Sequence, residues 1–502
     1  MLSLVHVVEW RAAVNPDQIA LTDDRGAELT YADLRAAMEA SAAAFAAAGV
    51  GPGDIAAVIA RNQAGWVTAM LGLIRAGALP AAVNWRLAAP EVAALLGLLA
   101  PAAIVTDDDC AALVAAANPG LPVLACPGTP AAASANGSPA PPPQRPAARL
   151  RGSEPAILLH TSGTTGRPKL VPLTHDQLIA AATFMSLEVP EAAPGARHLS
   201  ALPLFHVAGL ANLCYALFTG GHLRVLGGFS PAGFVDELAG RHIQLTQLVP
   251  TLIQAVTNEV SSRAEPPDLS DLVEVVYGAS PIRPDLLAHA VAVLGCRFRQ
   301  NYASTETGPL PISSLSPQDH DPARGRLATA GRPSLGWEVR LGDLSEIQVR
   351  GAAPLPGYWN NPEATARTLT PDGFYRTGDA GTIDGDGYIT IIDRLNDVVI
   401  TGGENVFPGE VEAVLAQHPA VADIAVIGIP DDTWGETVHA VVVAAPGFDT
   451  GQLLSWARER LAGFKCPTGV TVVPELPRNA TGKVTRAALR EPYWAGRDRR
   501  VS

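Results

Sequence analysis

One short segment, 159–175, concentrates residues that can bind phosphate. It contains the string LHTSGTTGRPKLVPLTH. Glycine lets backbone N–H groups approach an anion closely, hydroxyl groups donate hydrogen bonds to its oxygens, and lysine supplies a positive charge. The residues of these kinds are Thr161, Ser162, Gly163, Thr164, Thr165, Gly166 and Lys169. This composition predicts a polyphosphate-binding loop, with a Gly-rich hairpin turn as the alternative for such a loop taken alone.

Apolar residues flank this segment on both sides. The runs 156–159 and 170–173 are short and continuous, which is typical of buried strands. A Walker A loop is excluded, because the Gly-Lys-Ser/Thr ending is missing and Lys169 leads into a strand rather than a helix. We therefore expect the anion to bind at a loop that joins two strands.

Two later strings place candidate residues after apolar runs. LPLFHVAGL contains His206, and a single histidine of this kind is more often a hydrogen-bonded core residue. FRQNYASTETGP contains Tyr302, which offers a flat ring, together with the Thr305 hydroxyl and the Glu306 carboxylate. Magnesium prefers hard oxygen ligands, so Glu306 is a candidate ligand. Helix capping is the alternative explanation for the Thr-Glu pair.

Two charged residues of the C-terminal part complete the candidate set. GFYRTGDAG contains Asp379, whose carboxylate can accept two hydrogen bonds from a ribose diol. PRNATGKVTRAALR places Lys483 on a glycine turn ahead of a predicted helix. A single lysine at such a position is usually a solvated surface residue.

These strings, in this order, resemble the core motifs of the adenylate-forming superfamily. That superfamily comprises acyl-CoA synthetases, firefly luciferases and the adenylation domains of peptide synthetases. The most specific string is TSGTTGRPK, and the resemblance extends over essentially the whole chain. It is strongest to acid–CoA ligases of the fatty-acyl-CoA-synthetase type.

The resemblance implies roles by position. The implied catalytic residues are Lys483, His206, Glu306 and Thr165, with Glu306 as the Mg²⁺ ligand. The implied nucleotide- and CoA-binding residues are Thr161, Ser162, Gly163, Thr164, Gly166, Lys169, Gly278, Ala279, Ser280, Asn301, Tyr302, Ala303, Thr305, Asp379, Arg394, Gly402, Gly403 and Glu404. The implied acyl-pocket residues are Val207, Ala208, Gly209, Thr251 and Gly308. Asn396 falls at the hinge position, where most relatives have Asp or Lys.

The stretch around the implied acyl pocket carries few charges. No Asp or Glu occurs between His198 and Val235, and Arg224 is the only Lys or Arg between Arg197 and Arg241. Burying an ammonium without a counter-charge is costly, so an α-amino acid substrate is disfavoured. A dicarboxylate such as malonate is not favoured either. We expect a hydrophobic carboxylic acid, whether fatty, aromatic or polycyclic.

The implied reaction needs ATP, Mg²⁺ and CoA. It forms an acyl-adenylate and pyrophosphate, and then an acyl-CoA thioester and AMP. The main alternative is an adenylating enzyme that passes its acyl-AMP to a carrier protein, with CoA ligation weak or absent. A non-catalytic nucleotide-sensing protein is disfavoured, because Lys483, Glu306 and Asp379 are all present. A luciferase-like oxygenase is left open.

Strand and helix signals alternate along residues 1–125. Helices are predicted over 31–48, 66–75 and 91–99, and strands over 55–59 and 103–106. This alternation predicts an α/β fold with mostly parallel sheets flanked by helices. We expect an N-terminal domain over 1–395, with a flexible Pro-rich loop at about 127–149. A small mobile α+β domain is expected over 396–502.

Composition excludes several classes of protein. With 36 Lys and Arg against 49 Asp and Glu, the formal charge is −13, which disfavours nucleic acid or an anionic membrane as a partner. The five cysteines are widely spaced, which indicates reduced thiols rather than a disulfide framework or a zinc site. No signal peptide or membrane-spanning run is evident, so we expect a cytoplasmic protein. A homodimer is left open.

Overall fold

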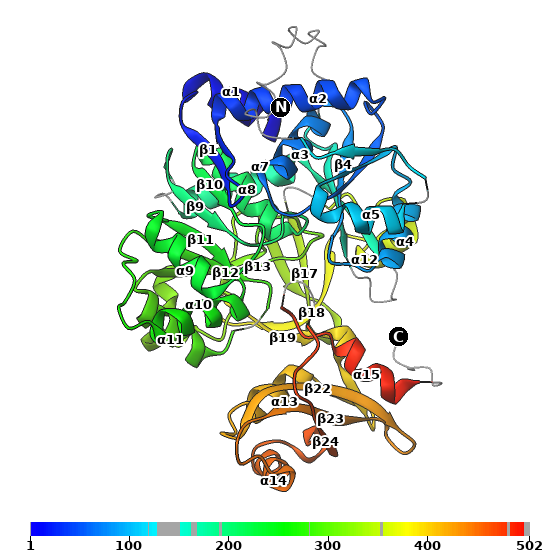
Figure 1. Cartoon of the computed structure of the whole chain (residues 1–502). Helices are drawn as coiled ribbons and strands as arrows, with labels where there is room; N and C mark the ends of the chain where they lie inside the picture. The colour runs from blue at the N-terminus through cyan, green and yellow to red at the C-terminus, as the bar shows by residue number, and fades with distance from the viewer. Residues whose placement is uncertain are drawn as a thin grey trace. The chain divides into compact units, whose positions relative to one another are not determined.

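The structure is a computed structural model, and it describes residues 2–118, 120–127, 151–161, 168–189, 193–280, 282–351, 355–478 and 482–495. Five residues of the predicted phosphate loop, namely Ser162, Gly163, Thr164, Thr165 and Gly166, lie outside the described residues. So does nearly all of the predicted Pro-rich loop. The chain forms two compact units (Figure 1). The large unit consists of Met1–Trp337 and Gly351–Thr368, and the small unit of Glu338–Arg350 and Leu369–Ser502.

A nine-stranded sheet forms one half of the large unit. Its strand order is β15-β14-β13-β12-β11-β9-β10-β1-β2, and the strands from β13 to β1 run parallel to one another. Only the edge strands β2, β14 and β15 pair antiparallel. The strands are β1 (Ile19–Asp23), β2 (Glu28–Thr30), β9 (Arg197–Ser200), β10 (His222–Val225), β11 (Leu245–Leu248), β12 (Glu274–Gly278), β13 (Arg297–Tyr302), β14 (Ser313–Leu315) and β15 (Arg332–Pro333).

A six-stranded sheet forms the other half, in the order β6-β5-β3-β4-β7-β8. All of its pairs are parallel except β7 with β8. Its central strands are continuous apolar runs buried on both faces, as parallel sheets require. The strands are β3 (Ile55–Ile59), β4 (Leu79–Ala82), β5 (Ala103–Thr106), β6 (Val123–Ala125), β7 (Pro155–Thr161) and β8 (Lys169–Thr174).

Helices cover both sheets of the large unit. They are α1 (Leu4–Val14), α2 (Tyr31–Ala47), α3 (Ala64–Ala76), α4 (Ala89–Leu99), α5 (Ala111–Ala117), α7 (His175–Glu188), α8 (Val207–Thr219), α9 (Pro231–Gly240), α10 (Pro250–Ser262), α11 (Pro284–Leu294) and α12 (Pro362–Thr368). Helices α9, α10 and α11 lie together beside β11 and β12 (Figure 1), and they share a hydrophobic core with that end of the sheet.

Local sequence fixes the helix that follows the predicted phosphate loop. The side chain of Thr174 accepts a hydrogen bond from the Gln177 N–H, and the Gln177 side chain accepts one from the Thr174 N–H. This reciprocal capping box starts α7 directly after β8. The sequence at residues 174–177 therefore determines where α7 begins.

The small unit contains a four-stranded and a five-stranded sheet. The first has the order β16-β17-β18-β19, and the second β21-β20-β23-β22 with β24 paired to β23. The strands are β16 (Trp337–Leu341), β17 (Glu346–Gly351), β18 (Tyr375–Ile383), β19 (Ile389–Arg394), β20 (Val399–Thr401), β21 (Glu404–Val406), β22 (Val421–Asp431), β23 (Gly435–Ala444) and β24 (Gly469–Val472). The helices are α13 (Pro408–Leu415), α14 (Thr450–Arg460) and α15 (Arg486–Trp494).

The predicted α/β class is confirmed, and so are the predicted early helices and strands, within a few residues. The predicted domain division after residue 395 stays a prediction. By packing, residues 338–350 and 369–395 belong to the compact unit that contains the C-terminal part. Within the described residues, no helix has the length and apolar character needed to cross a membrane.

Candidate active site

The predicted phosphate loop joins two paired strands of the six-stranded sheet. Strand β7 ends at Thr161, β8 begins at Lys169, and these two residues are partners in the antiparallel register. The pairing holds both ends of the loop next to each other. Lys169 therefore begins a strand, as the sequence predicts, and places an ammonium beside the end of β7.

Lys169 and Glu306 are brought together through a residue that the sequence did not indicate, Tyr358. The Lys169 Nζ lies 4.6 Å from the centroid of the Tyr358 ring. The Tyr358 hydroxyl donates a hydrogen bond of 2.9 Å to Glu306 Oε1. All three residues belong to the large unit. A predicted phosphate ligand and a predicted magnesium ligand thus share one aromatic neighbour.

His206 lies immediately before α8, in a buried environment. Burial, followed by the charges of His160 and Arg86, lowers the pKa of His206 to about 4. His160 Nε2 accepts a hydrogen bond from the Asn84 N–H, and burial lowers the pKa of His160 to about 4 as well. At neutral pH both imidazoles are uncharged, so His206 can exchange hydrogen bonds with a ligand without adding a charge.

The nine-stranded sheet brings several predicted residues to one edge. Strands β9, β11, β12 and β13 are parallel, so their carboxyl ends lie along the same edge, where ligands of open α/β sheets bind. The predicted residues end or follow these four strands. After β9 come His206, Val207, Ala208 and Gly209, and after β11 comes Thr251. At or after the end of β12 are Gly278, Ala279 and Ser280, and at or after the end of β13 are Asn301, Tyr302, Ala303, Thr305, Glu306 and Gly308.

Two glycines at this edge are required by close backbone contacts. A Cβ on Gly278 would lie 2.2 Å from the Asn301 carbonyl oxygen, and one on Gly209 would lie 2.2 Å from the Pro203 carbonyl oxygen. Ala279, which follows Gly278, has a left-handed backbone with φ of 71°. Asn301 Oδ1 is buried without a hydrogen-bond partner among the described residues, which fits a site for a ligand donor group.

In the small unit, the structure brings together Asp379, Arg394 and Lys483. Asp379 and Arg394 are partners on β18 and β19, and Arg394 Nε lies 2.6 Å from Asp379 Oδ1. Burial lowers the pKa of Lys483, and the nearby Arg394 lowers it further, whereas Asp379 and Asp397 act in the opposite direction. Lys483 is therefore a half-buried lysine among charged neighbours rather than a fully solvated surface residue.

Lys483 precedes α15, and the first residue of that helix anchors it. Arg486 lies 2.7 Å from Glu412 Oε2, 3.2 Å from Asp397 Oδ2 and 3.4 Å from Asp393 Oδ1. These carboxylates come from α13, from the 3₁₀ turn Leu395–Asp397, and from β19. Arg486 carries no local sequence signal of this role, because only the fold assembles its three partners.

The predicted hinge and the predicted binding residues Gly402, Gly403 and Glu404 also lie in the small unit. Asn396 is in the 3₁₀ turn Leu395–Asp397. Gly402 and Gly403 form the turn between β20 and β21, where Thr401 pairs with Glu404. Both glycines have positive φ, 59° and 88°, which is typical of a tight hairpin turn.

The available metal ligands fit a magnesium ion that is shared with substrate phosphates better than a metal ion held by protein side chains alone. Among the described residues, no group of three or more His, Cys, Asp or Glu side chains could hold a metal ion. Mg²⁺ is commonly bound through one or two carboxylates together with substrate phosphates. A single carboxylate at Glu306, near the end of the phosphate loop, suits that mode of binding.

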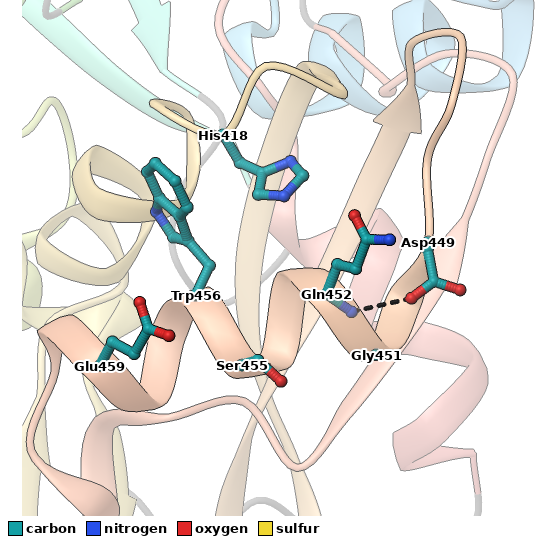
Figure 2. Close-up of a pocket in the computed structure, with 7 residues that line it drawn as sticks. All are labelled: His418, Asp449, Gly451, Gln452, Ser455, Trp456 and Glu459. Carbon is teal, nitrogen blue, oxygen red and sulfur yellow. Dashed lines mark hydrogen bonds between the residues drawn. The ribbon is translucent and has the colours of Figure 1, made fainter.

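A pocket of about 520 Å³ on the small unit is separate from these residues (Figure 2). It is lined by His418, Asp449, Gly451, Gln452, Ser455, Trp456 and Glu459. Asp449 accepts a hydrogen bond from the Gln452 N–H and so caps α14. None of the lining residues is a predicted site residue, and the capping bond accounts for the Asp449 carboxylate in structural terms.

Known protein families match the chain along most of its length. Residues 8–359 match the family described as AMP-binding enzyme, and residues 410–483 match the AMP-binding enzyme C-terminal domain. The feruloyl-CoA synthase of an Amycolatopsis species is 35% identical, over 96% of this chain and 97% of its own. A fatty acid–[acyl-carrier-protein] ligase of Streptomyces coeruleorubidus is 34% identical, over 100% of this chain and 98% of its own.

A solved structure gives the same result. The o-succinylbenzoate-CoA synthetase of Bacillus subtilis, in complex with its acyl-adenylate intermediate, aligns with a TM-score of 0.84 and 28% identity, over 96% of this chain and 97% of that chain. The same enzyme in complex with ATP and magnesium also aligns with a TM-score of 0.84. The predicted resemblance to adenylate-forming enzymes is confirmed, and the chain belongs to the AMP-binding enzyme family.

Proposed function

We propose that this protein is an AMP-forming acid–thiol ligase. It uses ATP and Mg²⁺ to convert a hydrophobic carboxylic acid to an acyl-adenylate, and it then transfers the acyl group to CoA. The observation that carries this proposal is full-length similarity to an aromatic acid–CoA ligase, together with the retention of Lys169, Glu306, Asp379 and Lys483. As ATP and CoA are cytoplasmic cosubstrates, we place the reaction in the cytoplasm.

The first step joins two anions, the carboxylate substrate and ATP. Its main requirements are therefore to neutralise their negative charge and to align the reacting atoms. A carboxylate oxygen of the acid attacks the α-phosphorus of ATP, and the bond to the leaving pyrophosphate breaks. Lys169 would bind the phosphates, and Lys483 would bind the acid and the α-phosphate. Mg²⁺ held by Glu306 would supply further positive charge. The neutral His206 would position both reacting groups by hydrogen bonding.

The second step needs a different reactant, the CoA thiol, at the same acyl group. The CoA sulfur attacks the acyl carbonyl carbon, and the bond from that carbon to AMP breaks. We propose that residues 396–502 form a mobile domain that turns about Asn396, withdrawing Lys483 and presenting the Gly402–Gly403 turn. Domain rotation of this kind lets one pocket serve two steps. Asn in place of the usual Asp or Lys at the hinge would affect this step rather than adenylation.

Helix α8 supports a hydrophobic acid as the substrate. It is largely apolar, and no Asp or Glu lies between His198 and Val235 to pair with an ammonium. A carrier-protein acceptor is the second candidate, because the Streptomyces relative is named a fatty acid–[acyl-carrier-protein] ligase. The first step is the same for both acceptors.

Pyrophosphate exchange tests the proposal directly. We expect the purified protein to exchange labelled pyrophosphate into ATP with fatty or aromatic acids, and not with α-amino acids. Mass spectrometry of reactions with CoA, with an acyl carrier protein, or with neither then identifies the acceptor. A protein that never consumes ATP with any acid of the panel contradicts the proposal.

A further inference from the structure

Tyr358 lies between two oppositely charged residues of the proposed site. Its ring faces the Lys169 ammonium at 4.6 Å, and its hydroxyl donates to Glu306 Oε1 at 2.9 Å. Tyr358 is almost fully buried, at 9% exposure. None of the motifs that the sequence analysis used contains this residue.

Two hydrogen bonds from backbone N–H groups hold the segment that carries Tyr358 in place. The Trp359 N–H donates to the Leu170 carbonyl at 2.9 Å, which ties this segment to the residue after Lys169. The Tyr358 N–H donates to Thr365 Oγ1 at 2.9 Å, which ties it to α12. The fold thus positions the Tyr358 backbone, and the Tyr358 side chain packs within a buried hydrophobic cluster of the large unit.

The contacts of Tyr358 keep the two charges available to a ligand. Among the described residues, Lys169 and Glu306 form no direct ion pair, and the tyrosine is their common neighbour. An ammonium over an aromatic face keeps its positive charge, because the attraction is to the ring quadrupole. A hydroxyl donor likewise orients a carboxylate without neutralising it. A direct Lys169–Glu306 pair would instead cancel both charges.

We infer that Tyr358 is a positioning residue for MgATP: its hydroxyl orients Glu306 for the metal, and its ring holds Lys169 apart from Glu306 for the phosphates. This inference rests on the proposed function, since it presumes that ATP and Mg²⁺ bind here. Residues that hydrogen-bond to a metal ligand typically change metal affinity when they are removed.

Calorimetric titration of ATP at a series of Mg²⁺ concentrations tests this role without relying on catalysis. Tyr358→Phe removes the hydroxyl and keeps the ring. We expect it to raise the Mg²⁺ concentration for half-maximal ATP binding by about 10-fold, with ATP binding in the absence of Mg²⁺ unchanged. Tyr358→Leu also removes the ring, so Mg²⁺-free ATP binding should weaken as well.

A double variant separates positioning from a general structural effect. If the hydroxyl acts through Glu306, Tyr358→Phe combined with Glu306→Gln should be no worse in Mg²⁺ dependence than Glu306→Gln alone. Tyr31→Phe is the matched control, because the Tyr31 hydroxyl is also buried and donates to the Gly221 carbonyl at 2.9 Å. We expect it to lower the melting temperature and leave the Mg²⁺ dependence unchanged.

An unchanged Mg²⁺ dependence in Tyr358→Phe, or fully additive losses in the double variant, overturns the inference. The outcome for the proposed function is distinct, because pyrophosphate exchange by the wild-type protein decides it. A wild-type protein that binds MgATP in a Tyr358-dependent way but activates no acid supports the inference and contradicts the function. A wild-type protein that binds no MgATP contradicts both.

Discussion

At the scale of single residues, the small unit brings the side chains of Asp379, Arg394 and Lys483 close together. Lys483 is half-buried, and Arg394 lies close enough to oppose its charge, so burial and this repulsion lower the pKa of the Lys483 ammonium. Asp379, which pairs with Arg394 at 2.6 Å, and Asp397 offset only part of this lowering. An incoming carboxylate or phosphate would relieve the repulsion between Lys483 and Arg394. Positive groups that are already in place stabilise the negative charge that develops in a transition state.

Replacement of Lys483 should therefore affect the first half-reaction strongly. We expect Lys483→Ala to lower the rate of acyl-adenylate formation by about 10²–10³-fold, the effect of losing one preorganised donor. The measurement is pyrophosphate exchange with a saturating acid. Lys465→Ala is the control, because Lys465 also belongs to the small unit but pairs with Glu410 at 2.6 Å. Exchange at the wild-type rate in Lys483→Ala contradicts the role.

At the scale of secondary-structure elements, the parallel strands bring distant segments to one edge. The sequence predicted loops after strands and the order of the motifs, because apolar runs and turn residues are local signals. It could not predict Tyr358, since that residue reaches the site only where the Trp359 N–H bonds to Leu170. Arg86 was missed for the same reason, because its proximity to His206 depends on the fold.

Helix α15 depends on one buried guanidinium. Burial raises the pKa of Glu412 and of Asp393, and Arg486 opposes both shifts. Without Arg486, two buried carboxylates would lose their counter-charge. We expect Arg486→Met to lower the free energy of unfolding by about 3–5 kcal/mol, measured by urea denaturation, because unpaired buried charges are costly.

The control for Arg486→Met is another arginine of the small unit. Arg478 pairs with Asp423 at 2.6 Å, but both side chains are about one-third exposed. Arg478→Met should therefore cost no more than about 1 kcal/mol, as partly exposed pairs do. Equal losses in the two variants would show that burial of the network does not determine its contribution.

At the scale of the whole molecule, packing groups segments that the chain order separates. Strand β17 pairs with β18, so residues from before and after α12 form one sheet. A boundary drawn along the sequence cannot show this, because strand pairing across an intervening segment leaves no local pattern. The two compact units also differ in how many histidines have a pKa that burial lowers: six lie in the large unit, whereas the small unit has His439 in addition to the Arg486 carboxylates.

The large unit should lose stability in mild acid for this reason. Six histidines have a pKa lowered to about 4 or below, and burial is the largest cause of the shift at each of them. They are His160, His175, His198, His206, His222 and His320. Unfolded histidine titrates near pH 6.5. Below that pH the unfolded chain takes up protons that the folded unit does not, so stability present above pH 6.5 is lost as pH falls towards 4.

Hydrogen exchange at pH 7.5 and pH 5.0, corrected for intrinsic rates, can follow each unit separately. The raised pKa values of Glu412 and Asp393 act in the opposite direction, because the folded small unit binds those protons more readily than the unfolded chain. We therefore expect opening free energies to fall between pH 7.5 and pH 5.0 in peptides of the large unit, and to fall less in peptides around α13 and α15. His198→Phe should reduce the pH dependence of the large unit, since it removes a fully buried imidazole. Equal loss of protection in both units at pH 5.0 would mean that the buried histidines do not set the acid response.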